Sequence, residues 1–199
     1  MSITNIVERI IYAPLYLYFK ISKSTHNISE EIENWSNVLL VPEFGNKFYT
    51  GIWLLANLKE FRSLLYFRYN TWKFNPFKLL YPGIDSLYFT YGQKIGKGLI
   101  IQHGYNTRIS CNGIGDNCQI WQGVTLGKIK SGRNAGLPTL GNNVKVCCYS
   151  IVLGDIRIGN NVTIGAGSVV LKSVPDNCTV VGNPARIVRI NGERVDKPL

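Results

Sequence analysis

The sequence predicts a mainly β protein: a parallel β-helix of six-residue repeats that follows an N-terminal α-helical region. Three observations support this prediction. Aliphatic residues recur with a period of six after residue 94, glycine or asparagine stands at the turns between them, and the first half of the chain has a different composition. With 199 residues, 45% of them apolar and 17% charged, the chain is expected to fold around one main core with an appendage.

Residues 1–92 make up the expected N-terminal region, which is rich in aromatic residues. The spacing of apolar side chains predicts one helix over 3–20 and a second over 49–68. Pro76 and Pro82 then interrupt the chain before the repeats begin. We therefore expect a helical appendage that ends near the start of the β-helix.

The composition limits the compartment and the partners. The net charge of +10 predicts an anionic partner, such as nucleic acid, an acidic membrane surface or a phosphorylated cofactor. Five cysteines without a C-x-x-C motif, beside only two histidines, predict neither a metal site nor a disulfide scaffold. Glu8, Arg9 and Pro14 interrupt the first apolar stretch, so neither a signal peptide nor a membrane span is expected. A cytoplasmic chain with reduced thiols is predicted.

The repeat begins at Ile95 and predicts a β-helix domain over 93–185, followed by a C-terminal tail over 186–199. Short strands that meet at glycine or asparagine corners form triangular coils of about eighteen residues, with one aliphatic side chain of each strand on the axis. The predicted axial residues are Ile95, Ile101, Ile114, Ile120, Leu126, Leu140, Val146, Val152, Ile158, Ile164 and Val170.

Two breaks in this period predict the site. The spacing from Ile101 to Ile114 is thirteen residues, one too many, and the surplus lies just after His103. The spacing from Leu126 to Leu140 is fourteen, which predicts an extruded loop over about 128–138. Because a regular prism has no cleft, we expect functional residues where the period is broken.

The motifs of the repeat region resemble a known family. "IGKGLIIQHG", "IGDNCQIWQGVTLG", "LPTLGNNV", "VLGDIRIGNNVTIGAGSVVLKSVP" and "VVGNPARIV" are similar to the serine acetyltransferase branch of the hexapeptide-repeat acyltransferases. The resemblance covers about residues 87–190 and leaves out the first 85. It implies a left-handed parallel β-helix, a homotrimer, and direct transfer of acetyl from acetyl-CoA to a hydroxyl, without a metal.

The resemblance also implies the residues of the reaction. His103 matches the histidine that acts as general base in the family. Tyr88 stands where the family has an aspartate that orients this base, and Gln102 stands where it has an aspartate of the amino-acid site. Gly136 and Leu137 replace an Arg-His pair on the loop. Lost charge-assisted bonds are worth about 1.5–3 kcal/mol each, so serine is expected to bind poorly.

For the cofactor, the resemblance implies a groove between neighbouring subunits. Lys172 and Arg186 are the expected partners of the CoA phosphates, with Lys128, Lys130 and Arg133 as alternatives. Backbone amides near Gly127 and Lys128 are expected to stabilise the oxyanion. The run Cys147-Cys148-Tyr149 replaces small residues, so its tyrosine is expected to narrow the groove, and Cys148 is not expected to act as a nucleophile. The predicted cofactor-binding residues are Gly127, Lys128, Cys148, Ala166, Gly167, Lys172 and Arg186.

The replaced acids favour a neutral acceptor. We therefore expect O-acetylation of a sugar hydroxyl in capsular or exopolysaccharide biosynthesis, where a looser resemblance to bacterial surface-polysaccharide O-acetyltransferases points. Two alternatives remain open: serine O-acetylation in cysteine biosynthesis, and a non-catalytic β-helix that serves as an assembly subunit. The basic and aromatic segment 59–81 predicts either packing on the protein or contact with an anionic membrane. His26 is expected to be an ordinary surface residue, and no nucleic-acid binding is expected.

Overall fold

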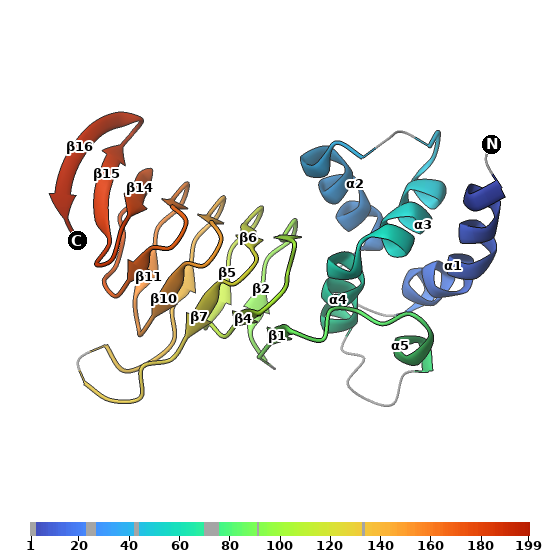
Figure 1. Cartoon of the computed structure of the whole chain (residues 1–199), viewed down its shortest axis with the longest axis horizontal. Helices are drawn as coiled ribbons and strands as arrows, with labels where there is room; N and C mark the ends of the chain where they lie inside the picture. Colours follow the sequence, from blue (N-terminus) through green and yellow to red (C-terminus); the bar gives the residue numbers. More distant parts are fainter. Residues whose placement is uncertain (1–2, 23–26, 42–43, 70–75, 91, 133) are drawn as a thin grey trace. The chain divides into compact units, whose positions relative to one another are not determined.

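The structure, a computed structural model, describes residues 3–22, 27–41, 44–69, 76–90, 92–132 and 134–199. The chain divides into two compact units, Met1–Asp85 and Ser86–Leu199. The first is helical and the second is a β-helix, as the colours of Figure 1 show along the sequence. The second unit starts at Ser86 rather than at 93, because the strand over Leu87–Phe89 already pairs with the first coil.

The N-terminal unit contains five helices in its described residues. The predicted helix over 3–20 is present, but the predicted helix over 49–68 is wrong in one respect, because Leu58 is extended (φ −117°, ψ 100°) and divides it in two. The carbonyls of Leu55 and Ala56, at the end of the first half, both accept hydrogen bonds from the guanidinium of Arg62. This contact satisfies carbonyls that a helix end leaves open. The helices are α1 (Ile3–Ile21), α2 (Ile28–Leu39), α3 (Lys47–Asn57), α4 (Lys59–Arg68) and α5 (Pro76–Leu80).

Helix α2 was not predicted, although its start carries a recognisable signal. The side chain of Asn27 accepts a hydrogen bond from the backbone amide of Ser29 at 2.8 Å, and Glu30 follows three residues after the cap. Within the same helix, Glu31 forms an ion pair with Arg68 of α4 at 3.0 Å, and both side chains are almost fully buried. This ion pair ties the second helix to the fourth.

The burial of α4 favours packing over membrane contact for residues 59–68. Arg62 and Arg68 lie in the interior and serve the packing of the helices, so they are not presented to headgroups. Phe61, Leu64 and Leu65 are fully buried as well. Residues 70–75 of this segment lie outside the described residues. The packing alternative therefore holds for α4.

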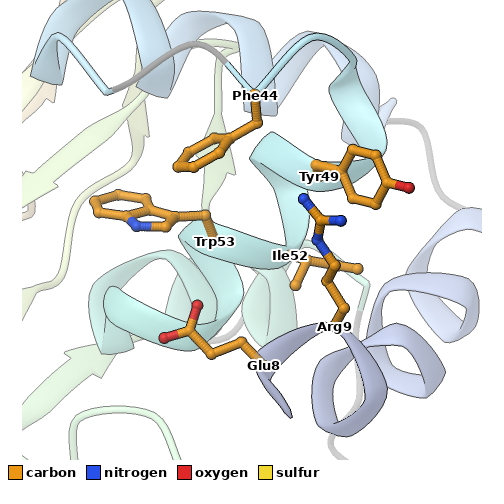
Figure 2. Close-up of a pocket in the computed structure, with 6 residues that line it drawn as sticks. All are labelled: Glu8, Arg9, Phe44, Tyr49, Ile52 and Trp53. Carbon is orange, nitrogen blue, oxygen red and sulfur yellow. The ribbon is translucent and has the colours of Figure 1, made fainter. Parts of the chain in front are cut away.

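Aromatic contacts join α1 to α3. Figure 2 shows Arg9 of α1 reaching over the ring of Tyr49, 3.6 Å from the ring centroid, and Phe44 beside Trp53, with ring centroids 6.2 Å apart. The small pocket among these side chains has a volume of about 10 Å³, roughly the size of one water molecule. It is a packing defect and too small for a ligand.

The second unit confirms the predicted class, a parallel β-helix of about five coils (Figure 1). Its three faces are parallel sheets, extended by an antiparallel hairpin at the C-terminal end. One face holds β1 (Leu87–Phe89), β4 (Thr107–Ile109), β7 (Thr125–Gly127), β10 (Ile151–Leu153) and β13 (Val169–Val170). The second holds β2 (Lys94–Ile95), β5 (Gly113–Ile114), β8 (Thr139–Leu140) and β11 (Arg157–Ile158). The third holds β3 (Ile100–Gln102), β6 (Gln119–Trp121), β9 (Lys145–Val146), β12 (Thr163–Ile164), β14 (Cys178–Val181), β15 (Arg186–Ile190) and β16 (Glu193–Pro198).

The axial core forms as predicted, with one addition. All eleven predicted axial side chains are buried, and they stack in register, as in the row of Leu126, Val152 and Val170. Ile109 belongs to the same row, because it is fully buried and pairs with Leu126. The thirteen-residue spacing therefore consists of a long step of eight, from Ile101 to Ile109, and a short step of five to Ile114.

One corner of the prism is held by ladders of polar side chains. The side-chain oxygen of Asn142 accepts from the backbone amide of Asp116 at 2.8 Å, and that of Asn160 accepts from the amide of Asn142 at 2.9 Å. One position further on, Asn161 bonds to both Asn143 and Asn177 through side chains, and these three residues adopt φ of 56–57°. The left-handed conformation is the reason for asparagine at these corners.

The C-terminal residues form ordered strands. The predicted tail over 186–199 forms β15 and β16, an antiparallel hairpin that extends the third face. Among the described residues, no helix has both the length and the apolar character needed to cross a membrane.

Candidate active site

His103 lies at a corner that is longer than its neighbours. Strand pairing aligns Gln102 with Trp121 and Arg108 with Thr125, so four residues (103–106) turn this corner where the next coil uses two (122–123). The surplus predicted after His103 is therefore an insertion of two residues at the corner, and the shortened step after Ile109 removes one again. The insertion lifts the corner out of the regular wall of the prism.

The imidazole of His103 is open to solvent. The residue is exposed, with a left-handed backbone (φ 59°), and its carbonyl accepts a hydrogen bond from the amide of Tyr105. Throughout the described residues, no side chain donates to or accepts from the His103 ring. Both ring nitrogens are therefore available to an incoming hydroxyl.

A buried threonine anchors this corner. Thr107 is fully buried, and its hydroxyl accepts from the amide of Gly123 at 3.1 Å and donates to the carbonyl of Tyr105 at 3.2 Å. The amide of Gly123 also bonds to the Tyr105 carbonyl at 2.9 Å. These bonds fix the inserted corner to the following coil, so the position of His103 is set by the scaffold.

The two other predicted catalytic residues have different partners from those expected. The ring of Tyr88 in β1 lies under the guanidinium of Arg108 in β4, 5.2 Å from the ring centroid. The Gln102 side chain donates to Gln119 at 3.2 Å. Neither side chain hydrogen-bonds to His103, and no carboxylate of the described residues contacts this ring either. Their assignment to the site remains a proposal.

Strand register places the predicted base and two predicted cofactor residues on one edge. Extending the pairing of β3, β6, β9 and β12 by one or two residues aligns His103 with Gln122, Cys148 and Ala166. We call these four positions the corner column. Ala166 and the following Gly167 are exposed, and a Cβ added at Gly167 would meet no atom within 4 Å. The small residues of the column therefore leave room for an extended ligand.

Tyr149 was predicted only as bulk that narrows the groove, and the structure gives it a defined position. Its backbone is left-handed (φ 59°), its side chain is 64% exposed, and a Cβ added at Gly123 would collide with its ring. The ring thus lies against Gly123, in the coil that follows the coil of His103. The signal in the sequence was a tyrosine at a position where the neighbouring coils have Gly123 and Gly167.

The extruded loop occupies the predicted interval 128–138 between β7 and β8. It is tied back to the prism, since Asn134 donates to the carbonyl of Leu171 at 3.0 Å and accepts from the amide of Asp155 at 2.9 Å. Gly127, at its start, is buried, whereas Lys128 and Lys130 are exposed. Arg133 lies outside the described residues. The two lysines are therefore accessible to an anion.

The two preferred phosphate-binding residues are engaged within the chain. Lys172 donates to the backbone oxygen of Leu199 at 2.5 Å, and Arg186 forms an ion pair with Asp196 at 2.7 Å. Both contacts are exposed, so a phosphate can compete for them only by displacing these partners. Lys128 and Lys130 of the loop carry no such contact among the described residues.

Burial argues against Cys111 and Cys118 as nucleophiles. All five are free thiols, and burial raises the pKa of Cys111 to about 12 and that of Cys118 to about 11. The described residues contain no group of three or more His, Cys, Asp or Glu side chains that could hold a metal ion. His26 lies outside the described residues. Among the predicted catalytic residues, His103 remains the proposed base.

Comparison with known proteins finds relatives of the repeat region. Residues 138–172 match the family described as bacterial transferase hexapeptide (six repeats). A serine acetyltransferase of Synechococcus elongatus is 52% identical over 108 residues, which cover 53% of this chain and 43% of that protein. A serine acetyltransferase of Staphylococcus aureus is 51% identical over 108 residues, covering 53% and 50%. The chain spans about half the length of the curated relatives it matches.

Solved structures lead to the same group. A serine acetyltransferase from Neisseria gonorrhoeae superimposes with a TM-score of 0.63 at 28% identity, over 84% of this chain and 68% of that one. Soybean serine acetyltransferase complexed with serine gives 0.62 at 27% identity, over 81% and 67%. The repeats are therefore similar to those of bacterial hexapeptide transferases and of serine acetyltransferases. The expected likeness to surface-polysaccharide O-acetyltransferases is corrected, because the relatives found are serine acetyltransferases.

Proposed function

We propose that the chain is an acetyl-CoA-dependent O-acetyltransferase of the serine acetyltransferase type. The observation that carries this proposal is the exposed, unengaged imidazole of His103 on an inserted corner, aligned with small residues that a CoA arm can follow. The identity of about 50% to serine acetyltransferases over the repeat region supports it independently.

In the proposed reaction, the neutral imidazole of His103 accepts the proton of the acceptor hydroxyl while the hydroxyl oxygen attacks the thioester carbonyl. The carbon–sulfur bond then breaks, the acetyl group stays on the oxygen, and the CoA sulfur takes the proton back from the imidazolium. General-base assistance of this kind contributes about 10²–10⁴-fold. We propose direct transfer without an acyl-enzyme, and burial with raised pKa values makes Cys111 and Cys118 unsuitable as acyl carriers.

We propose that acetyl-CoA binds along the corner column. The column is lined by Cys148 and Ala166, which lie in successive coils, and Lys128 and Lys130 lie on the loop that starts at the end of β7. We propose that the pantetheine arm follows this edge and that loop lysines bind the phosphates. Amides near Gly127 and Lys128 remain our proposal for oxyanion stabilisation. A homotrimer and a cytoplasmic location, which the family resemblance implies, remain our proposals.

Serine is the acceptor favoured by the relatives, and it replaces the sugar as our first choice. A sugar hydroxyl stays the second candidate because of one observation: no carboxylate of the described residues contacts His103, and Tyr88 and Gln102 occupy the positions of the family's acids. A zwitterion loses charge-assisted bonds at such a site, whereas a neutral hydroxyl does not.

The test follows release of the CoA thiol from acetyl-CoA with L-serine, and separately with simple methyl glycosides. We expect His103→Asn to lower turnover by about 10²–10⁴-fold. Asparagine tolerates the left-handed backbone of position 103, so the variant keeps the corner intact. His26→Asn, which changes the other histidine, is the matched control and keeps wild-type turnover. If the wild-type protein turns over neither acceptor class, the proposed acetyltransferase activity is contradicted. The alternative of a non-catalytic assembly subunit then remains.

A further inference from the structure

The left-handed residues of the β-helix point to a second site residue. Among the described residues of 86–199, the residues other than glycine that have positive φ are asparagines, with two exceptions, His103 and Tyr149. Asparagine is well suited to this conformation, whereas an aromatic residue is a rare occupant. Both exceptions lie at the same corner of the prism, and one of them is the proposed base.

The register shows why Tyr149 is unusual. The residues aligned with it in the coils before and after are Gly123 and Gly167, which adopt φ of 70° and 68° without strain. A tyrosine in this row carries a conformational cost that its neighbours avoid. Residues kept in unfavourable backbone conformations concentrate at functional sites, where the side chain is needed in that place.

The side chain of Tyr149 is directed toward the coil of the base. Its ring lies on Gly123, whose amide bonds to the carbonyl of Tyr105, two residues after His103. The lack of a Cβ at Gly123 is what allows this approach. Tyr105 and Tyr149 are 55% and 64% exposed, so two tyrosine rings lie open at the corner of His103.

We propose that Tyr149 is a specificity-determining residue that binds the acceptor through the face of its ring. This inference rests on the proposed acetyl transfer and specifies its acceptor side. Tyrosine offers a rigid apolar face and one polar atom, which suits an acceptor with a carbon ring and hydroxyls. This inference favours the second acceptor candidate, a cyclic polyol such as a pyranoside, because serine is too small to cover the ring.

The decisive variant is Tyr149→Gly, because its structural and functional effects have opposite signs. Glycine removes the strain at φ 59°, so folding stability is expected to stay equal or rise. A binding function predicts instead that the KM for a methyl glycoside acceptor rises at least about fivefold, the scale of one lost aromatic contact. The KM for acetyl-CoA stays unchanged, and Tyr149→Phe retains most of the acceptor affinity.

Asn161→Gly is the matched control, since it makes the same left-handed change at the corner that holds the asparagine ladder. It is expected to leave both KM values at the wild-type level. Size-exclusion chromatography with light scattering accompanies every variant. A change of oligomeric state in Tyr149→Gly, or a rise confined to the KM for acetyl-CoA, overturns the acceptor assignment.

A binding measurement separates this inference from the proposed function. Saturation-transfer NMR with methyl glucoside, methyl galactoside and L-serine detects contact whether or not the protein turns them over. Glycoside signals that are present in the wild type and lost in Tyr149→Gly support the inference. The inference is overturned if the glycoside signals are absent from the wild type or persist in Tyr149→Gly. Turnover of serine in the thiol assay would still support the proposed acetyltransferase activity.

Discussion

The insertion of two residues at the corner 103–106 determines both the backbone conformation of His103 and the exposure of its imidazole. The long corner exposes the imidazole and gives it a left-handed backbone, while buried Thr107 holds the corner to the next coil. The main chain, rather than a neighbouring carboxylate, therefore positions the proposed base. Its orientation depends on bonds made around it and not on bonds made to it.

The contact between Tyr149 and Gly123 can be isolated by a pair of glycine variants. Gly123→Ala and Gly167→Ala place a Cβ on nearly the same left-handed backbone, but only the first meets the ring of Tyr149. We expect Gly123→Ala to lower the free energy of unfolding by about 1–3 kcal/mol more, the usual cost of overpacking. Urea unfolding of both variants measures the difference. In a Tyr149→Gly background the difference vanishes, and its persistence would contradict the contact.

The buried thiols predict a loss of stability at high pH. Burial raises the pKa of Cys111 and Cys118 to about 12 and 11, above the ordinary 9.0, so the folded state binds protons that the unfolded state releases. The stabilisation is complete below pH 9 and is lost as the pH rises toward 11–12. Urea midpoints between pH 8 and 10.5 should fall more steeply for the wild type than for the Cys111→Ala/Cys118→Ala variant. Parallel slopes would show that the thiols do not contribute.

At the scale of elements, the ion pair between α2 and α4 is expected to be a strong determinant of the helical unit. Arg68→Met leaves the charge of Glu31 buried without its cation, which costs about 3–5 kcal/mol. Replacing both partners, as in Glu31→Leu/Arg68→Met, restores much of the loss because no charge then remains inside. Thermal or urea unfolding tests the pair, with Lys47→Met as the control for the exposed bridge to Glu33. Equal effects of Arg68→Met and Lys47→Met would refute the buried pair.

The repeats were predictable because every coil has the same requirements for its axial and corner residues. Axial residues such as Leu126 and Val152 had to be aliphatic, and the corner residues had to tolerate left-handed angles, so period and composition gave the fold. The division at Leu58 was not predictable, because it depends on Arg62 folding back onto the end of α3. The N-cap of α2 at Asn27 was visible in the sequence and was overlooked in a polar stretch.

The site was predictable in part, for the same reason. A break in the period located His103, and the family motif named its chemistry. The actual partners of Tyr88 and Gln102, namely Arg108 and Gln119, come from neighbouring coils and follow only from the strand register. Ile109 was not predicted as an axial residue, because its long step of eight and short step of five sum to nearly two regular steps of six.

At the scale of the whole molecule, charge is concentrated in one unit. Residues 86–199 hold 13 Lys and Arg against 5 Asp and Glu, a net charge of +8 out of +10 for the chain. An anionic co-substrate is therefore attracted to the β-helix, and salt weakens this attraction. We expect the KM for acetyl-CoA to rise severalfold between low and moderate ionic strength, measured by thiol release.

The loop lysines provide the variant for this prediction. Lys128→Gln/Lys130→Gln should raise the KM for acetyl-CoA at low salt and flatten its salt dependence, because the two exposed lysines lie on the loop that follows Gly127. Lys94→Gln/Lys97→Gln, in the first coil of the β-helix, is the charge-matched control. If both double variants shift KM alike, the effect belongs to the overall field rather than to the loop.

The long step and the short step of the first coils have a practical consequence for redesign. The two extra residues at 103–106 and the residue saved between Ile109 and Ile114 confine the irregularity to less than one turn, after which β5 and β8 pair in the ordinary way. The length of this corner can therefore differ without changing the pairing of the following coils. Corners of other lengths and sequences can be grafted between Gln102 and Thr107 to present new groups to an acyl donor, while the coils beyond keep their alignment.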